Sequence, residues 1–126
     1  MEKKIIRTNN APAPIGPYNQ AVLCGEMLFI SGQIALDPVN GTLVDGNIEA
    51  ETTQVMKNLL AILDAAGMNF SNVVKTSIFL MDMGQFGLVN EVYARYFETD
   101  APARETVQVA GLPRGVNVEI SMIAAK

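Results

Sequence analysis

The fold of this 126-residue sequence is decided by the stretch Val73-Val74-Lys75-Thr76-Ser77-Ile78-Phe79-Leu80-Met81. The stretch is rich in β-branched and apolar residues on both faces, which predicts a central strand buried on two sides. Before it, Asn47 can cap a helix that stops at Gly67, with Glu49 and Glu51 placed favourably in its first turn. Apolar residues recur along that helix three and four apart, at Val55, Leu59, Ile62 and Ala66.

A second helix is predicted directly after the central strand. Asp82, with Gln85 three residues later, resembles a capping box. The residues that follow place an apolar stripe on one helix face, formed by Phe86, Val89, Val92 or Tyr93, and Tyr96. Two more strands are expected at about 105–110 and 116–124, joined by the loop Gly111-Leu112-Pro113-Arg114-Gly115.

The N-terminal part adds three strands to this pattern. Residues 3–8 can form a short strand, and residues 19–24 and 27–31 flank Gly25-Glu26 as a hairpin. The order is therefore β-β-β-α-β-α-β-β, which predicts an α+β fold with two helices on one face of the sheet. The other face is expected to be rich in apolar residues and to carry partner subunits. Since no linker or repeat interrupts the chain, residues 1–126 are predicted to form one domain.

The composition excludes several classes of function. Histidine is absent, which excludes Ser-His-Asp and Cys-His catalysis and histidine metal ligands. The sequence has one cysteine, Cys24, which excludes an intramolecular disulfide and a cysteine-cluster zinc site. The formal charge of −4 argues against nucleic acid. Charged residues make up 17%, against roughly 25% in typical domains, which favours self-association. With no signal peptide or membrane-spanning run expected, the protein is predicted to be cytoplasmic.

Two charged residues are candidates for binding or chemistry. Arg104 stands at the start of a strand, where its guanidinium could grip a carboxylate or phosphate through two parallel hydrogen bonds; a surface arginine is the alternative. Glu119 shares one face of its strand with Asn117 and Ser121. If residues 110–115 close a hairpin, Thr106 lies opposite Glu119, and Arg104 and Glu119 become diagonal neighbours. A simple cross-strand salt bridge on a solvated face explains this pair equally well.

Weaker candidates surround them. Asn90 lies near the apolar stripe of the second helix, where it could be a polar anchor or a surface residue. Tyr18 could present a phenol at a loop tip, although packing explains most tyrosines. Gly32, in Ser31-Gly32-Gln33, could expose backbone groups, or it could mark a strand end.

These residues resemble the Rid family (YjgF-type, reactive intermediate deaminases), specifically its RidA branch. The resemblance runs over essentially the whole chain, with the expected spacing. It implies a chorismate-mutase-like mixed sheet, a homotrimer with active sites between subunits, and no cofactor or metal. It also implies hydrolysis of 2-imino acids, such as 2-iminopropanoate and 2-iminobutanoate, to 2-keto acids and ammonia. The matching segments are residues 10–18, Ser31-Gly32-Gln33-Ile34, Val89-Asn90-Glu91-Val92-Tyr93, Pro102-Ala103-Arg104, Leu112-Pro113 and Val118-Glu119-Ile120.

The resemblance also assigns roles by position. Arg104 would bind the substrate carboxylate, and Glu119 would orient or activate the attacking water. The pocket would be completed by Tyr18, Asn90 and the backbone at Gly32. The chain departs from the family at Thr106, where many members have cysteine two residues after the arginine. A thiol is therefore not available there, but a hydroxyl can still hydrogen-bond substrate or water.

Two other functions remain open. A non-catalytic regulatory module could use the same cleft to bind small carboxylates; it would need Arg104 but tolerate loss of Glu119. Nucleic-acid processing has been proposed for family members, but the acidic charge balance and the missing histidines argue against it.

Overall fold

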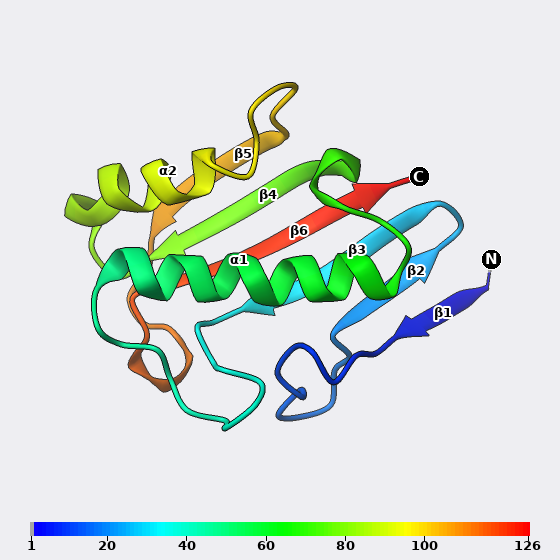
Figure 1. Cartoon of the computed structure of the whole chain (residues 1–126), viewed down its shortest axis with the longest axis horizontal. Coiled ribbons are helices and arrows are strands. Elements are labelled where there is room, and N and C mark those ends of the chain that lie inside the picture. Colours follow the sequence, from blue (N-terminus) through cyan, green and yellow to red (C-terminus); the bar gives the residue numbers. More distant parts are fainter. Residues whose placement is uncertain (1) are drawn as a thin grey trace.

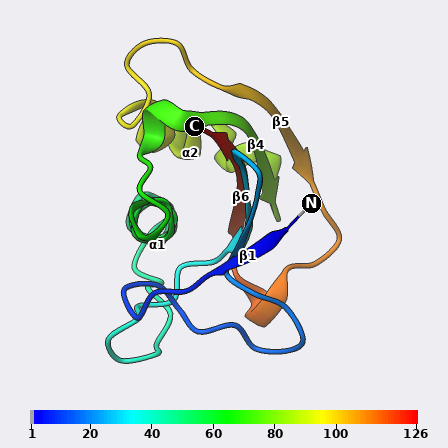
Figure 2. The same ribbon diagram turned by 90° about the vertical axis from the view of Figure 1, so that its right-hand side faces the viewer.

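A computed structural model describes residues 2–126 and shows a six-stranded sheet with both helices on the same face (Figures 1 and 2). The strands lie in the order β1-β2-β3-β6-β4-β5. The α+β class and the order of elements predicted from the sequence are therefore confirmed. The elements are β1 (Lys3–Ile6), β2 (Ala21–Cys24), β3 (Met27–Gln33), α1 (Ile48–Ala65), β4 (Val73–Leu80), α2 (Phe86–Ala94), β5 (Ala103–Gln108) and β6 (Val118–Ala125).

Helix α1 begins and ends where its sequence predicts. The Asn47 side chain accepts a hydrogen bond from the backbone N–H of Ala50 at 2.7 Å, which caps the first turn. After the helix, Gly67 adopts a φ of +72°, a left-handed conformation that costs glycine little and that ends helices. The buried stripe of α1 packs on the sheet and includes Val55, Met56, Leu59, Ile62 and Leu63.

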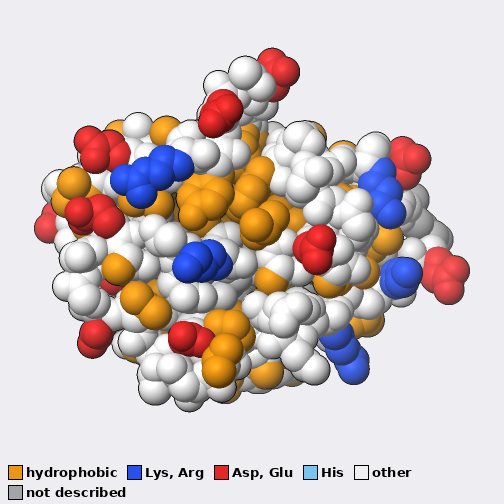
Figure 3. All heavy atoms as spheres, in the orientation of Figure 1, with side chains coloured by type: hydrophobic (Ala, Val, Ile, Leu, Met, Phe, Trp, Pro, Cys, Tyr) orange, Lys and Arg blue, Asp and Glu red, His pale blue; other side chains and the backbone are white. Residues whose placement is uncertain are grey.

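The start of the second helix differs in detail from the expected capping box. The Asp82 side chain accepts from the N–H of Gly84 at 2.8 Å and begins a short 3-10 turn, η2 (Met83–Gln85), before α2. Residues Val89, Val92 and Tyr93 of α2 are buried, as the apolar stripe predicts. Figure 3 shows hydrophobic side chains gathered in the middle of the helix-bearing side, between α1 and α2. Neither helix of residues 2–126 has both the length and the apolar character that a membrane span requires.

Strand β4 is covered on one face only. Thr76, Ile78 and Leu80 are buried beneath the helices, whereas Ser77 and Phe79 are only partly buried on the opposite, outer face of the sheet. The prediction of burial on two sides is therefore wrong for the isolated chain: one layer of helices covers one face. The outer face is rich in apolar side chains, as expected, and Phe29 on β3 and Val107 on β5 expose 45% and 39% of their surface.

The predicted pairing of the last two strands is wrong. Strand β5 pairs in parallel with β4, and β6 lies on the other side of β4, between β4 and β3, antiparallel to both. The physical reason is the crossover through α2, which returns the chain parallel to β4. The end of β4 then bonds to segments on both sides: Val109 N–H donates to Leu80 O at 2.9 Å, and Met81 N–H donates to Asn117 O at 3.1 Å.

Candidate functional site

Arg104 is fixed on the inner, helix-bearing face by residues of α2. It lies opposite Thr76 in the β4–β5 register. Its Nη1 donates a hydrogen bond to Asn90 Oδ1 at 2.8 Å. Its Cζ lies 5.0 Å from the ring centre of Tyr93 and 5.6 Å from that of Phe86, within the range of cation–π contacts. Because a guanidinium has five N–H donors, the bond to Asn90 leaves donors for an anion.

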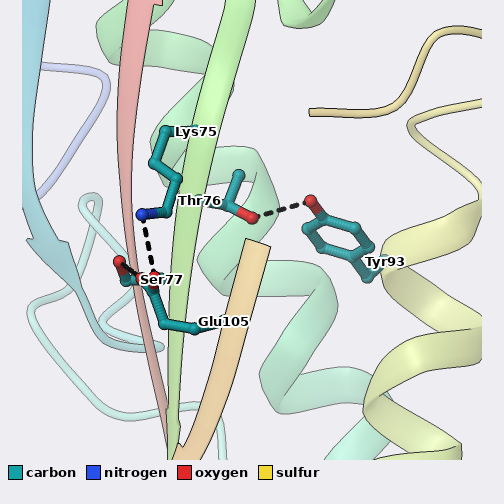
Figure 4. Close-up of polar contacts among 5 residues, drawn as sticks. All are labelled: Lys75, Thr76, Ser77, Tyr93 and Glu105. Atoms are coloured by element: carbon teal, nitrogen blue, oxygen red, sulfur yellow. Dashed lines mark hydrogen bonds and ion pairs between the residues drawn. The ribbon is translucent and has the colours of Figure 1, made fainter. Parts of the chain in front are cut away.

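A cleft of about 430 Å³ opens beside this guanidinium. Behind it, the hydroxyl groups of Tyr93 and Thr76 are hydrogen-bonded at 2.8 Å (Figure 4). Burial raises the pKa of Tyr93, against the smaller opposing effects of this hydrogen bond and of the Arg104 charge. The phenol therefore stays neutral at neutral pH. The cleft lining consists of Asn90, Tyr93, Ala94, Phe97, Ala101, Pro102 and Arg104.

Thr106 lies two residues after Arg104 on the same face of β5. It stands opposite Ile78, and its Oγ1 is buried without a hydrogen-bond partner among residues 2–126. Buried hydroxyls are normally hydrogen-bonded, so the orphaned Oγ1 has unused hydrogen-bonding capacity two residues from Arg104. Thr106 is not among the residues that line the cleft beside Arg104.

Glu119 lies in a different pocket, on the outer face of the sheet. It is half-buried on β6 opposite Phe79, in a pocket of about 510 Å³. Burial raises the pKa of its carboxyl group. A carboxyl group of raised pKa in a pocket is suited to take up and return a proton. The other lining residues are Ile15, Tyr18, Ser31, Gly32, Ile34, Pro113 and Arg114.

Arg104 and Glu119 thus point to opposite faces of one sheet, and the expectation that they are diagonal neighbours is wrong. Figure 4 shows the two faces on either side of β4: Thr76 points to Tyr93 on the helix side, and Lys75 and Ser77 point away from it. Lys75 and Glu105 form a cross-strand ion pair on the outer face, at 2.8 Å, and Ser77 is also bonded to Glu105. The bonds from Lys75 and Ser77 lower the pKa of Glu105. The structure brings together Arg104, Asn90 and Thr106 in one cluster and Glu119, Tyr18 and Gly32 in another.

Three features of these two clusters are not predicted from the sequence. The two aromatic rings beside Arg104 belong to residues expected only to pack in the core. Arg114, at the tip of a loop, lines the Glu119 pocket. Glu51 was assigned only to the first helical turn, but it is 3% exposed and its carboxylate accepts from Asn117 N–H at 2.8 Å, from Asn117 Nδ2 at 2.9 Å and from Val118 N–H at 3.2 Å. Glu51 thereby holds the start of β6, next to Glu119.

Comparisons with known proteins agree with this fold. The family model described as Endoribonuclease L-PSP matches residues 8–126. The chain is 53% identical over 124 residues to the 2-iminobutanoate/2-iminopropanoate deaminase of Mus musculus. The aligned region covers 98% of this chain and 92% of that relative. Among solved structures, RidA from an Antarctic Psychrobacter is 41% identical with a TM-score of 0.94, covering 98% of this chain and 99% of that one. E. coli TdcF with bound serine is 39% identical with a TM-score of 0.93, covering 98% of both chains.

The family model and the two solved structures cover nearly all of the described residues, so the likeness is not confined to one motif. It includes both the strand that carries Arg104 and the strand that carries Glu119. The chain belongs to the endoribonuclease L-PSP family, which confirms its resemblance to the Rid proteins.

Proposed function

We propose that this protein is a hydrolytic deaminase that converts reactive 2-imino acids, such as 2-iminopropanoate and 2-iminobutanoate, to 2-keto acids and ammonia. The observation that carries the proposal is the Arg104 guanidinium, which is fixed by Asn90 and two aromatic rings at the edge of an open cleft. A planar cation held in this way suits the carboxylate that every 2-imino acid carries. The 53% identity to a deaminase of that name supports the same substrate class.

We further propose that the complete site forms between two copies of the chain. Arg104 and Glu119 lie on opposite faces of the sheet, so one substrate molecule can touch both only if they come from different subunits. The exposed apolar side chains of the outer face favour burial against another copy. A cyclic homotrimer with Arg104 of one subunit facing Glu119 of the next brings the two residues together and buries the outer face. We propose that this trimer is cytoplasmic.

In the proposed reaction, Arg104 binds the carboxylate and the Thr106 hydroxyl hydrogen-bonds the substrate. Glu119 accepts a proton from a water molecule as the water oxygen bonds to C2 and the C=N π bond breaks. That proton is returned to the nitrogen, which gives a carbinolamine. Glu119 then takes the proton of the new hydroxyl group and passes it to the same nitrogen, so that a C=O bond forms as the C–N bond breaks and ammonia leaves. Tyr18, Asn90 and the Gly32 backbone complete the pocket. A substrate that is already electrophilic needs only positioning and this proton transfer.

Two other functions make different demands on these residues. A non-catalytic module that binds small carboxylates needs Arg104 but not Glu119. Cleavage of RNA is named in the family description, but the chain has no histidine and a formal charge of −4, which disfavour acid–base cleavage by imidazole and binding to a polyanion.

A coupled assay tests the proposal. A serine or threonine dehydratase generates the imine, and release of the 2-keto acid is followed with and without this protein. We expect the protein to accelerate release, and we expect Arg104→Ala to abolish the acceleration. Keto acid release at the uncatalysed rate, together with tight binding of an unreactive keto acid, would overturn the enzyme proposal and favour the regulatory module.

A further inference from the structure

Strand β3 is interrupted beside Glu119 by a bulge. Between the paired positions Ile30–Met122 and Gln33–Ile120, β3 advances by one residue more than β6 does. Ser31 anchors the irregular segment: its N–H donates to Gln20 O at 2.9 Å, and its Oγ donates to Asn19 O at 2.6 Å. Bulges of this kind re-aim side chains and are frequent next to active sites.

Gly32 follows Ser31 in this bulge, and the Glu119 side chain occupies the space that a side chain at position 32 would need. A Cβ added to Gly32 would lie 2.8 Å from both Cδ and Oε1 of Glu119, and 3.1 Å from its Cγ. Gly32 is not among the residues of positive φ, so its backbone does not itself require glycine. The close approach of the carboxyl group is therefore the local reason for glycine at this position.

We propose that Gly32 is a positioning residue for Glu119: the missing side chain lets the Glu119 carboxyl group lie against the β3 bulge and face the pocket. The proposal deepens the proposed function, which assigns proton transfer to Glu119. The charged and titratable groups that share this pocket are Tyr18 and Arg114. Phe79 lies opposite on β4, and the Lys75–Glu105 pair lies further along the outer face.

The consequence is a steric link between strand and carboxylate. A methyl group at position 32 would meet the flexible end of Glu119 rather than a backbone atom, so the carboxyl group would move and the fold would stay. A displacement of about 1 Å at a reacting group can lower a rate roughly 10²-fold. The contact with β3 also keeps water from the carboxyl group, and burial is what raises its pKa.

The test compares Gly32→Ala with a matched control, Gly46→Ala, where an added Cβ meets nothing within 4 Å. We expect Gly32→Ala to lower kcat by about 10²-fold, and Gly46→Ala to leave it unchanged. In a Glu119→Gln background, adding Gly32→Ala should lower kcat by less than about twofold, because the effects of two residues that act through one another are not additive. A further loss of kcat as large as in the wild-type background would overturn the proposal.

A second measurement reports the link without reference to activity. In ¹³C-glutamate-labelled protein, the Glu119 carboxyl resonance should shift in Gly32→Ala, and its titration midpoint should move closer to that of an ordinary glutamate, with no change in Gly46→Ala. An unmoved resonance overturns the proposal and leaves the deaminase function intact. A moved resonance with normal turnover in Glu119→Gln supports the positioning and overturns the catalytic role of Glu119. If Gly32→Ala does not fold, recovery by an added Glu119→Asp supports the contact, and no recovery overturns it.

Discussion

Co-assembly of two inactive variants provides a sharp test of the shared site. We take Arg104→Ala subunits, which keep Glu119, and Glu119→Gln subunits, which keep Arg104. Loss of a charge-assisted contact to the substrate costs about 2–5 kcal/mol, so Arg104→Ala alone should retain at most roughly 3% of wild-type activity. The kcat of Glu119→Gln alone should be lower than that of the wild type by roughly 10²–10⁴-fold. Neither variant can then account for substantial activity in a mixture.

Because Arg104 and Glu119 lie on opposite faces of the sheet, the activity that mixed assemblies recover depends on which variants are neighbours. In a cyclic trimer, each site draws Arg104 from one subunit and Glu119 from its neighbour. Every cyclic trimer that contains both variants has one complete site among its three, because one junction joins a native Arg104 to a native Glu119. We therefore expect purified mixed trimers to show about a third of the wild-type specific activity, well above the residual activity of either variant alone.

The assay needs verified mixed assemblies. The variants carry different affinity tags, are refolded together, and are purified over both tags; native mass spectrometry confirms the composition. Turnover is then measured with the dehydratase-coupled reaction. As the matched control, Arg104→Ala is mixed with the Arg104→Ala/Glu119→Gln double variant, which can form no complete site. Mixed trimers no more active than this control would refute the shared site.

Four further predictions use single variants. Arg104→Lys should restore little kcat/KM in the coupled assay, because an ammonium cannot reproduce a planar two-bond grip; near-normal kcat/KM would contradict the carboxylate role. Glu119→Gln should lower kcat but leave calorimetric binding of an unreactive keto acid unchanged, since Arg104 still holds the carboxylate; equal loss of both would make Glu119 a binding group. Glu51→Ala should lower the free energy of unfolding in urea by about 3 kcal/mol, because it removes the acceptor of the buried Val118 N–H and of the part-buried Asn117 N–H; an unchanged midpoint would show that water replaces the carboxylate. Phe29→Asp should yield smaller particles in light scattering, because it places a charge on the exposed apolar outer face; an intact trimer would place the interface elsewhere.

The elements of the fold could be predicted from local sequence, but their pairing could not. The cap at Asn47 and the spacing of Val55, Leu59 and Ile62 identify α1 because a helix is specified by near neighbours. The partner of β5 depends on where the crossover through α2 returns the chain, and no residue of β5 encodes it. Pairing strands that are neighbours in sequence therefore places Arg104 and Glu119 on one face, and the observed register places them on opposite faces.

The site residues show the same division. Residue types and family motifs single out Arg104, Asn90 and Thr106, and the structure places Asn90 against Arg104 and Thr106 two residues further along the same strand. The buried role of Glu51 joins residues 66 positions apart in the chain. An acidic residue in a first helical turn gives no sign of such a distant partner, since dipole compensation alone explains it.

The position of β6 has a consequence for synthesis on the ribosome. Residues 118–125 follow every other strand in the chain, yet they lie between β3 and β4 and bond to both. While they are still inside the exit tunnel, the β1–β2–β3 unit and the β4–α2–β5 unit have no strand to connect them. The two units then expose the edges that β6 will occupy, and unpaired edges invite association with other chains. The sheet is therefore expected to be completed only once residues 118–125 have left the tunnel, and a nascent chain halted before residue 118 should be recognised by chaperones as unfinished.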